Sequence, residues 1–395
     1  MKESPLKPTN KHILTINGGS SSIKFALYAT VKPLKRGLSG TVDRIGLSGT
    51  NLKFNEADGK PEVSRKLVAS NHKSAANALI DWLEKQIDFK SVTGVGHRVV
   101  HGMKHTEPEI VTKKLLAELR RISPNDPDHL PREIELIEVL RQRHPKLRQV
   151  ACFDTAFHQT MPRVAKLLPI PRRFDAKGIQ RYGFHGLSYE YIARALRQQA
   201  PGLAAGRVVV AHLGNGASLC GMRDGCSQET TMGFTALDGL VMGTRCGTLD
   251  AGVVLYMLQQ KGLTAHAVEQ VLYERSGLLG VSGLSSDMRT LLASSDPRAH
   301  EAVELFAFRV AQQTAVMAAS LGGLDGFVFT GGIGEHAAGV RAMVGERLRW
   351  LGVELDAAVN KGGPGRISTQ HSRVEVHVIT TDEEAMIAQH TNDML

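Results

Sequence analysis

The chain has 395 residues, 42% hydrophobic and 22% charged, which is the composition of a globular protein too long for a single core. Its 48 Lys and Arg against 39 Asp and Glu give a net charge of +9, but the basic residues are dispersed and aromatic residues make up only 5%. This balance favours small anionic substrates and argues against nucleic acid as a partner. No apolar run reaches the roughly 18 residues of a membrane span, and residues 1–12 lack the apolar region of a signal peptide. We expect a two-domain cytoplasmic protein with no membrane partner.

Short apolar runs alternate with amphipathic stretches along the chain, a pattern typical of α/β proteins. The first half predicts paired strands within 13–28, further strands at 95–100 and 149–153, and helices near 73–86, 112–122 and 131–143. The second half repeats this plan, with a helix at 188–198, strands from Arg207, helices through Gly322, a strand and turn at 326–334, and a last strand and helix at 374–379 and 382–389. We expect an N-terminal domain of residues 1–153, on which a C-terminal helix of about 383–395 packs, and a C-terminal domain of residues 154–382.

Three glycine- and hydroxyl-rich turns each follow an apolar run: NGGSSSIK at 17–24, HLGNGAS at 212–218 and FTGGIGEH at 329–336. At the end of a strand, such turns leave backbone N–H groups that can face an anion. One such turn is more often plain loop chemistry, because glycine reaches positive φ without strain. Three of them favour one nucleotide contacted from several strand ends.

Other motif assignments fit these turns less well. The chain contains no GxxxxGK[ST] P-loop and no GxGxxG dinucleotide fingerprint after its first strand. Ser21 to Lys24 matches the S-x-x-K of penicillin-binding proteins, but no KTG or SDN follows, and the alternation of Ile23, Phe25 and Leu27 predicts a strand where that motif needs a helix. The four cysteines form no CxxC pair, so reduced thiols without zinc are expected.

A second set of residues suits phosphoryl transfer, whose developing charge is stabilised by arginine, histidine and a metal ion. In GHRVVHG, strand alternation places the cation of Arg98 on the same face as Val100, which suits a small carboxylate with an alkyl tail. Asp154 directly follows an apolar strand, His185 lies between glycines in RYGFHG, and Arg245 is on the glycine-flanked loop MGTRCG. Structural alternatives remain: the two arginines as surface ion pairs, Asp154 as a helix cap and His185 as an ordinary loop residue.

These motifs together resemble the acetate kinase family, in the superfamily of acetate and sugar kinases, heat-shock protein 70 and actin. The resemblance runs from about residue 13 to about residue 389 and also includes FDTAFHQTMP, SSDMR and TDEEAMIA. It implies an α/β fold of two actin-like, ribonuclease H-like domains with the active site in the interdomain cleft. It also implies a homodimer, Mg²⁺ with Mn²⁺ as the alternative ion, and reversible phosphoryl transfer between ATP and acetate that gives ADP and acetyl phosphate.

The resemblance assigns roles by position. It implies catalytic roles for Asp154, His185 and Arg245, binding of the acyl substrate by Arg98, Val100 and Phe184, and metal binding by Asn17 and Glu383. The nucleotide contacts that it implies are Lys24, His212, Leu213, Gly214, Asn215, Gly216, Asp287, Met288, Arg289, Gly332, Ile333, Gly334, Glu335 and His336.

The chain departs from the family pattern around the acyl group. Thr248 replaces an aspartate expected to hold Arg245, Ala236 replaces a proline, and Met103 replaces a glycine. Asp128 or Asn125 is expected where the family has an apolar wall. Acetate and propionate are therefore both expected as substrates. A propionate- or butyrate-preferring acyl kinase, a polyol kinase of the same superfamily and a non-enzymatic ATP-binding switch remain alternatives.

Overall fold

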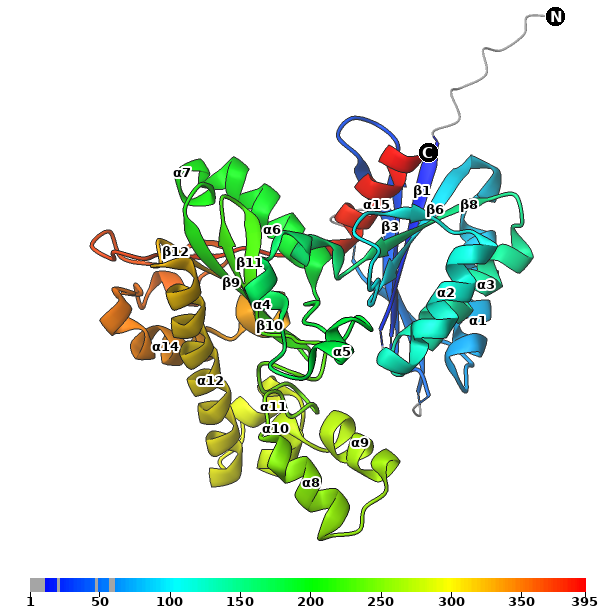
Figure 1. The fold of residues 1–395 in the computed structure, drawn as a ribbon. Coiled ribbons are helices and arrows are strands. Elements are labelled where there is room, and N and C mark those ends of the chain that lie inside the picture. The colour runs from blue at the N-terminus through cyan, green and yellow to red at the C-terminus, as the bar shows by residue number, and fades with distance from the viewer. Residues whose placement is uncertain (1–10, 20–21, 47–48, 57–60) are drawn as a thin grey trace, which may run out of the picture. The chain divides into compact units, whose positions relative to one another are not determined.

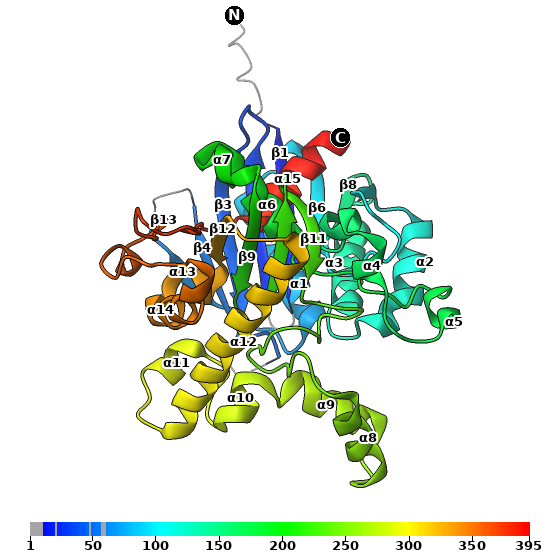
Figure 2. The same ribbon diagram turned by 60° about the vertical axis from the view of Figure 1, so that its left-hand side comes forward.

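The computed structural model describes residues 11–19, 22–46, 49–56 and 61–395. The chain divides into two compact units: unit 1 comprises Met1–Ala156 and Asp382–Leu395, and unit 2 comprises Phe157–Thr381. Each unit contains a mixed β-sheet with helices on its faces, so the predicted α/β class is confirmed (Figures 1 and 2). Ser20 and Ser21 of the first predicted turn, and most of the amino-terminal segment, lie outside the described residues.

The sheet of unit 1 has the strand order β5-β4-β3-β2-β1-β6-β8-β7 in the described residues. Strands β1 to β5 pair antiparallel in sequence order, whereas β6 is parallel to β1 and β8 is parallel to β6. The elements are β1 His12–Gly18, β2 Ile23–Ala29, β3 Lys35–Asp43, β4 Asn51–Asn55, β5 Val63–Lys66, α1 His72–Gln86, η1 Phe89–Ser91, β6 Val92–Val99, β7 Glu109–Ile110, α2 Lys113–Ile122, η2 Ser123–Asn125, α3 Leu130–Arg143, β8 Arg148–Phe153 and α15 Glu383–Met394.

Side-chain alternation along β1 sets the two faces of this sheet. Leu14 and Ile16 join a core with helices α1 and α3, whereas Ile13 packs with Ala388 of α15 on the opposite face. Helix α15 lies so close to β6 that a Cβ added to Gly96 would clash with Thr391 and Ile387. This close packing places the first turn of α15, which begins with two glutamates, against the central strands of unit 1.

The sheet of unit 2 repeats the plan in the order β11-β10-β9-β12-β14-β13. Strands β9, β10 and β11 pair antiparallel, and β12 and β14 extend the sheet in parallel from β9. Its elements are η3 Ala156–Thr160 at the boundary, α4 Arg163–Lys166, α5 Arg172–Asp175, α6 Gly186–Gln199, α7 Pro201–Ala204, β9 Arg207–Leu213, β10 Ala217–Arg223, β11 Cys226–Thr230, α8 Ala251–Gln259, α9 Ala265–Glu274, α10 Gly277–Ser282, α11 Met288–Leu292, α12 Pro297–Leu321, β12 Gly326–Thr330, α13 Gly331–His336, α14 Ala338–Arg347, η4 Arg349–Leu351, η5 Val359–Lys361, β13 Gly365–Arg366 and β14 Glu375–Val378.

The third predicted turn differs from the expectation. After Phe329 and Thr330, the residues GGIGEH form the short helix α13 rather than an irregular turn. The Glu335 carboxylate accepts a hydrogen bond from the Gly331 N–H (2.9 Å), which satisfies one of the backbone donors that a helix leaves at its first turn. A turn rich in glycine therefore becomes helical because its own glutamate caps it.

Candidate active site

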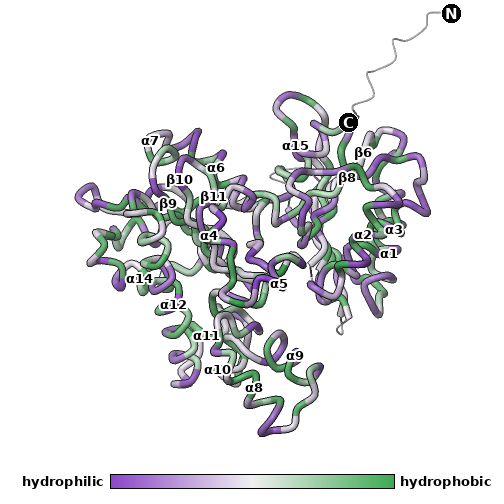
Figure 3. The backbone as a smooth tube through the Cα atoms, in the orientation of Figure 1, coloured by the Kyte–Doolittle hydropathy of each residue, from purple (hydrophilic) through white to green (hydrophobic). Residues whose placement is uncertain are grey.

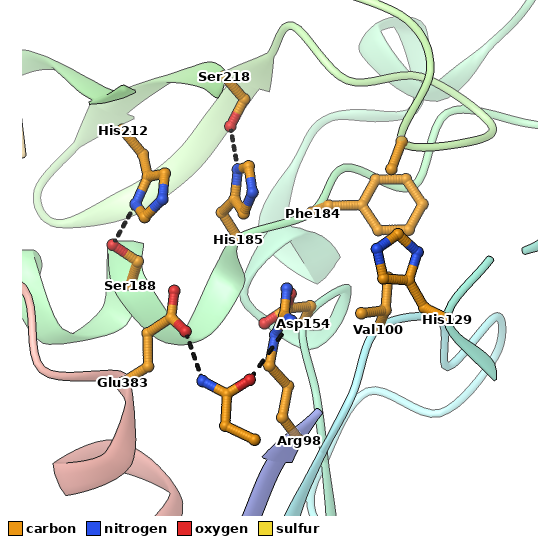
Figure 4. A network of polar contacts seen from close by, with 12 residues as sticks. Arg98, Val100, His129, Asp154, Phe184, His185, Ser188, His212, Ser218 and Glu383 are labelled. Atoms are coloured by element: carbon orange, nitrogen blue, oxygen red, sulfur yellow. Dashed lines mark hydrogen bonds and ion pairs between the residues drawn. The ribbon is translucent and has the colours of Figure 1, made fainter. Parts of the chain in front are cut away.

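Arg98 and Asp154 form a buried ion pair at the ends of two neighbouring parallel strands. Strands β6 and β8 align Arg98 with Cys152, so Asp154, just beyond β8, comes next to the guanidinium group. The Arg98 Nε and Nη2 atoms both donate to Asp154 Oδ2, at 2.9 and 2.5 Å (Figure 4). Asp154 is fully buried and the Arg98 side chain is 12% exposed. Burial opposes the charged form of Arg98, but Asp154 and Glu383 outweigh it and raise the pKa of Arg98.

A cluster of amide and carboxylate groups lies beside this ion pair in unit 1. The Asn17 amide, at the end of β1, donates to Glu383 Oε2 (2.9 Å) and Glu384 Oε1 (3.1 Å) of α15. The start of α15 is anchored by Asp382, which caps the helix and pairs with Arg36 at 3.2 Å. Lys24 is opposite Asn17 across β1 and β2, and the charge of Glu384 raises the pKa of its ammonium group.

The backbone of Val100 is hydrogen-bonded to a buried glutamate. The Val100 N–H donates to the Glu133 carboxylate, whose oxygens lie 3.0 and 3.2 Å away, and burial raises the pKa of Glu133 well above its ordinary value. The Nδ1 atom of His129, which Figure 4 labels, is 2.9 Å from Asp126 Oδ1. Asn125 donates to the sulfur of Met103 (3.4 Å). The hydrogen bond from its N–H to Glu133 therefore fixes the backbone of Val100.

His185 and Arg245 converge on the HLGNGAS turn of unit 2. A Cβ added to Gly216 would lie 2.6 Å from Arg245 Nη2 and 3.2 Å from His185 Nε2, so the turn needs glycine there for the two side chains to approach. His185 precedes α6 in the left-handed conformation, with φ of 59°, which is uncommon for a residue other than glycine. Phe184 is buried, and its carbonyl oxygen lies 2.9 Å from His158 Nε2.

Hydrogen bonds to Ala236 and Asp238 fix the loop that carries Arg245. Arg245 Nη1 donates to the carbonyl oxygen of Ala236 (2.7 Å), the residue that replaces the expected proline. The hydroxyl of Thr248, which replaces the family's aspartate, donates to Asp238 Oδ1 (2.8 Å). The backbone of Ala236 therefore helps to orient the Arg245 guanidinium group.

Two stacked histidines lie beside the HLGNGAS turn. The rings of His185 and His212 lie 4.3 Å apart at an angle of 22°. His185 Nδ1 is 2.8 Å from the Ser218 hydroxyl, and His212 Nδ1 is 2.8 Å from the Ser188 hydroxyl (Figure 4). Each Nδ1 is thereby held by a serine, which leaves both Nε2 atoms on the side of the glycine turn.

A cavity of about 530 Å³ brings together most of the predicted nucleotide-binding residues of unit 2. Its lining consists of Gly214, Asn215, Ser286, Asp287, Met288, Arg289, Leu292, Gly332, Ile333, His336 and Ala337. Glu335 does not line the cavity. Its carboxylate stabilises the adjacent backbone, because it accepts hydrogen bonds from the N–H groups of Gly331 and Thr381. The remaining predicted residues of this group are outside the lining: His212 and Leu213 end β9, Gly216 is in the turn before β10, and Gly334 belongs to helix α13.

Several residues of the site were missed by sequence reasoning. Glu384, Glu133 and Ser218 make buried contacts with predicted residues, and Tyr189 makes a buried contact with Ser218. The buried Arg341 supports the third turn, donating to the carbonyl oxygens of Gly334 (2.9 Å) and Glu335 (2.8 Å). The adjacent carboxylate in TDEEAMIA and the serine that ends HLGNGAS were signals for Glu384 and Ser218. Only the fold identifies the other three.

Within residues 11–19, 22–46, 49–56 and 61–395, no three His, Cys, Asp or Glu side chains are grouped as metal ligands. Over the same ranges, no helix has the length and apolarity needed to cross a membrane.

Comparisons with known proteins agree over nearly the full length. The Acetokinase family profile matches residues 12–389. An acetate kinase of Rhodopseudomonas palustris strain TIE-1 is 50% identical over 386 residues, covering 96% of this chain and 97% of that protein. Among solved structures, a propionate kinase from Francisella tularensis has a TM-score of 0.90 at 35% identity, covering 98% and 100% of the two chains. Acetate kinase from Porphyromonas gingivalis has a TM-score of 0.85 at 33% identity, covering 97% and 99%.

Proposed function

Because this chain belongs to the acetokinase family, we propose that it transfers the γ-phosphoryl group of ATP reversibly to acetate, giving ADP and acetyl phosphate. The observation that carries the proposal is the convergence of Arg245 Nη2 and His185 Nε2 on Gly216. Two donors aimed at one glycine turn are what a transferring phosphoryl group requires, because charge spreads over its equatorial oxygens in the transition state.

Unit 1 supplies the groups that handle the acyl substrate. Arg98 is a permanently charged planar donor that binds a carboxylate, and Asp154 fixes its orientation. The apolar side chain of Val100 suits the methyl group of acetate, and the Glu133 carboxylate holds the Val100 backbone in place. A carboxylate bound by Arg98 is therefore oriented as the nucleophile. Asp154 acts at the same point as the acid or base.

The oxygen ligands of unit 1 fit Mg²⁺, which prefers carboxylate and carbonyl oxygens together with phosphates. Asn17 and Glu383 would hold the ion, which when bound neutralises charge on the phosphates. Lys24 provides a fixed cation for the same phosphates. These residues orient the anionic groups and reduce their mutual repulsion.

Unit 2 supplies the groups for ATP. The cavity beside Gly214 and Gly332 has the volume of a small-molecule site and takes the adenosine end. Backbone N–H groups at the end of β9 and in the glycine turn that follows it would serve the phosphates. His185 and Arg245 then stabilise the phosphoryl group during transfer.

Acetate is the favoured substrate because the acetate kinase of Rhodopseudomonas palustris is 50% identical to this chain, whereas the propionate kinase of Francisella tularensis is 35% identical. A propionate kinase with a TM-score of 0.90 supports propionate as a second substrate. One methylene in an apolar pocket changes binding by only about 1 to 3 kcal/mol, so the two acids are expected to compete. A polyol kinase is the less favoured alternative, since a polyol has no carboxylate for Arg98.

We further propose that the protein is a homodimer built on helix α8. None of the nine residues of α8 is buried, although the helix is strongly apolar (Figure 3). Leu255 and Tyr256 are 51% and 50% exposed, and Val253, Leu263, Val281 and Leu284 are also exposed. Exposed apolar side chains along one helix are typical of a protein interface, and α8 of a second copy would cover them.

A substrate panel tests the activity. The protein is incubated with ATP, Mg²⁺, hydroxylamine and one of formate, acetate, propionate, butyrate or glycerol, and the acyl phosphate is trapped as the hydroxamate while ADP is measured separately. We expect acetate and propionate to react, butyrate to react poorly, and glycerol to give no ADP. ADP formation with glycerol alone would favour a polyol kinase. ATP binding without phosphorylation of any acid would favour a non-enzymatic switch.

A further inference from the structure

His185 is the end of a buried chain of hydroxyl groups. Its Nδ1 lies 2.8 Å from the Ser218 hydroxyl, which lies 2.5 Å from the hydroxyl of Tyr189. Ser218 and Tyr189 are fully buried, and His185 is 8% exposed. Tyr189 follows His185 by one turn of α6, and Ser218 is at the start of β10, so helix and sheet together fix all three groups. The other ring nitrogen, Nε2, is the atom that faces Gly216.

The available protons determine which group donates and which accepts along the hydroxyl chain. A tyrosine hydroxyl is a much stronger acid than a serine hydroxyl, so Tyr189 donates to Ser218. Ser218 has one proton, which it then donates to His185 Nδ1. An imidazole that accepts at Nδ1 carries its own proton on Nε2 when it is neutral. The hydroxyl chain therefore makes the neutral ring a donor toward Gly216.

The permanent charge of Arg245 beside His185 favours this neutral form. The His212 ring is stacked on it at 4.3 Å, and Arg245 Nη2 converges on the same glycine. His158 lies behind, edge-on to Tyr189, and burial lowers its pKa to about 4, so it adds no charge at neutral pH. A proton added to His185 would place a second positive charge beside Arg245.

We propose that Ser218 and Tyr189 are positioning residues that hold His185 in its neutral Nε2–H form, ready to donate to an oxygen of the transferring phosphoryl group. This inference rests on the proposed kinase activity. It also goes further, because it assigns roles to two residues outside the predicted site and states the protonation state in which His185 works. His185 then needs no proton from solvent, and its donor is present throughout the neutral and alkaline range.

Kinetics of Ser218→Ala and Tyr189→Phe test the proposal. Each variant frees the ring to carry its proton on Nδ1, so kcat at pH 8 should fall about ten- to a hundredfold, the loss typical when a group that orients a functional histidine is removed. KM for acetate and ATP should change little. As pH falls toward 6, protonation restores a donor at Nε2, so the ratio of wild-type to variant kcat should shrink.

Two controls separate positioning from packing. Tyr182→Phe removes a tyrosine hydroxyl that donates to the carbonyl oxygen of Gly178 (2.8 Å), and it should leave kcat and its pH profile unchanged. In the Ser218→Ala background, Tyr189→Phe should not lower kcat further, because the hydroxyl chain is already interrupted. Additive losses, or a wild-type to variant ratio that does not change with pH, would overturn the proposal.

The protonation state is also measured without turnover. The protein is labelled with ¹⁵N-histidine, and the His185 signals are assigned by their loss in His185→Asn, since asparagine tolerates the left-handed conformation. We expect the proton on Nε2 in the wild type and a shift of population toward Nδ1–H in Ser218→Ala. A wild-type proton on Nδ1 would refute the proposal even if acetate is phosphorylated. Absence of kinase activity with Nε2–H observed would instead refute the proposed function.

Discussion

Arg98 and Arg245 are the two cations whose removal is expected to affect turnover most. Loss of one donor to a developing charge costs about 2.7 to 4 kcal/mol, so Arg245→Ala should lower kcat about a hundred- to a thousandfold. Arg98→Ala alone would leave Asp154 as a buried unpaired charge, so this substitution is combined with Asp154→Asn. The kcat of the double variant should fall at least as much as that of Arg245→Ala. Activity is measured on folded protein as judged by circular dichroism.

A surface arginine supplies the matched control for this pair. Arg275 follows α9 in unit 2 and is exposed. Arg275→Ala removes the same charge from the same unit and should leave kcat within about twofold, as expected of a surface change within ±0.5 kcal/mol. Near-wild-type turnover by Arg245→Ala would contradict the assigned role of Arg245.

The site residues that the sequence predicts are those that follow strands. Asp154, Gly214 and Gly332 lie within a few residues of a strand end, and a hydrophobic run followed by glycine or a carboxylate is visible in one sequence. Ser218 and Tyr189 were not predicted, because their function depends on burial and on the meeting of a helix with a strand. The partner of Thr248 was likewise not predicted, since nothing local indicates that its hydroxyl reaches Asp238, ten residues earlier.

At the scale of single elements, helix α15 depends on close contact with β6. A Cβ at Gly96 would clash with Thr391 and Ile387, so Gly96→Ala should destabilise unit 1 by about 1 to 3 kcal/mol, the usual cost of overpacking. Because α15 carries Glu383 and Glu384, kinase activity should become more dependent on Mg²⁺. Thermal unfolding and Mg²⁺ titrations of activity measure the two effects.

Gly202 provides the comparison for this substitution. An added Cβ there meets no atom within 4 Å, so Gly202→Ala should be neutral or slightly stabilising. If Gly96→Ala proves as stable as Gly202→Ala, the packing of α15 on β6 does not constrain the start of that helix.

Helix α8 is the element on which the proposed dimer depends. Leu255→Glu should convert the dimer to a monomer in sedimentation equilibrium, because it places charges at the centre of an apolar interface. Val68→Glu, at a single valine that is 97% exposed in unit 1, should leave the oligomeric state unchanged. A wild-type monomer at micromolar concentration would contradict the dimer proposal.

Element boundaries show what local pattern can and cannot specify. Asn71 and Thr112 cap the first turns of α1 and α2, and Gly322 ends α12 in the left-handed conformation. The sequence therefore indicates where these helices begin or end. Helix α13 was predicted as a turn, because its stability comes from Glu335 and the buried Arg341 rather than from its three glycines.

At the scale of the whole molecule, buried neutral histidines limit stability in acid. Burial lowers the pKa of His97 and of His158 to about 4, one histidine in each unit. A histidine with a lowered pKa in the folded state contributes its stability fully above about pH 6.5, and this contribution is lost as pH falls through about 4. Each contributes at most about 3 kcal/mol by the shift of its pKa.

His97 offers a clean measurement of this effect. The two tryptophans of the chain, Trp82 and Trp350, lie in different units, so Trp350→Phe leaves fluorescence that reports unit 1 alone. In that background, urea unfolding should show stability falling between pH 6.5 and 4, and His97→Gln should flatten the fall. An equal fall in the variant would mean that other groups control the acid sensitivity of unit 1.

Direct attack of a carboxylate oxygen on the γ-phosphorus is the central claim, and ³¹P NMR with [¹⁸O]acetate tests it most directly. ATP, Mg²⁺ and labelled acetate are mixed with the protein, and the spectrum is followed without any coupling enzyme. The account predicts ADP and acetyl phosphate, with an isotope shift on the acetyl phosphate signal because its bridging oxygen comes from acetate. Formation of AMP and pyrophosphate, or of inorganic phosphate alone, would contradict it.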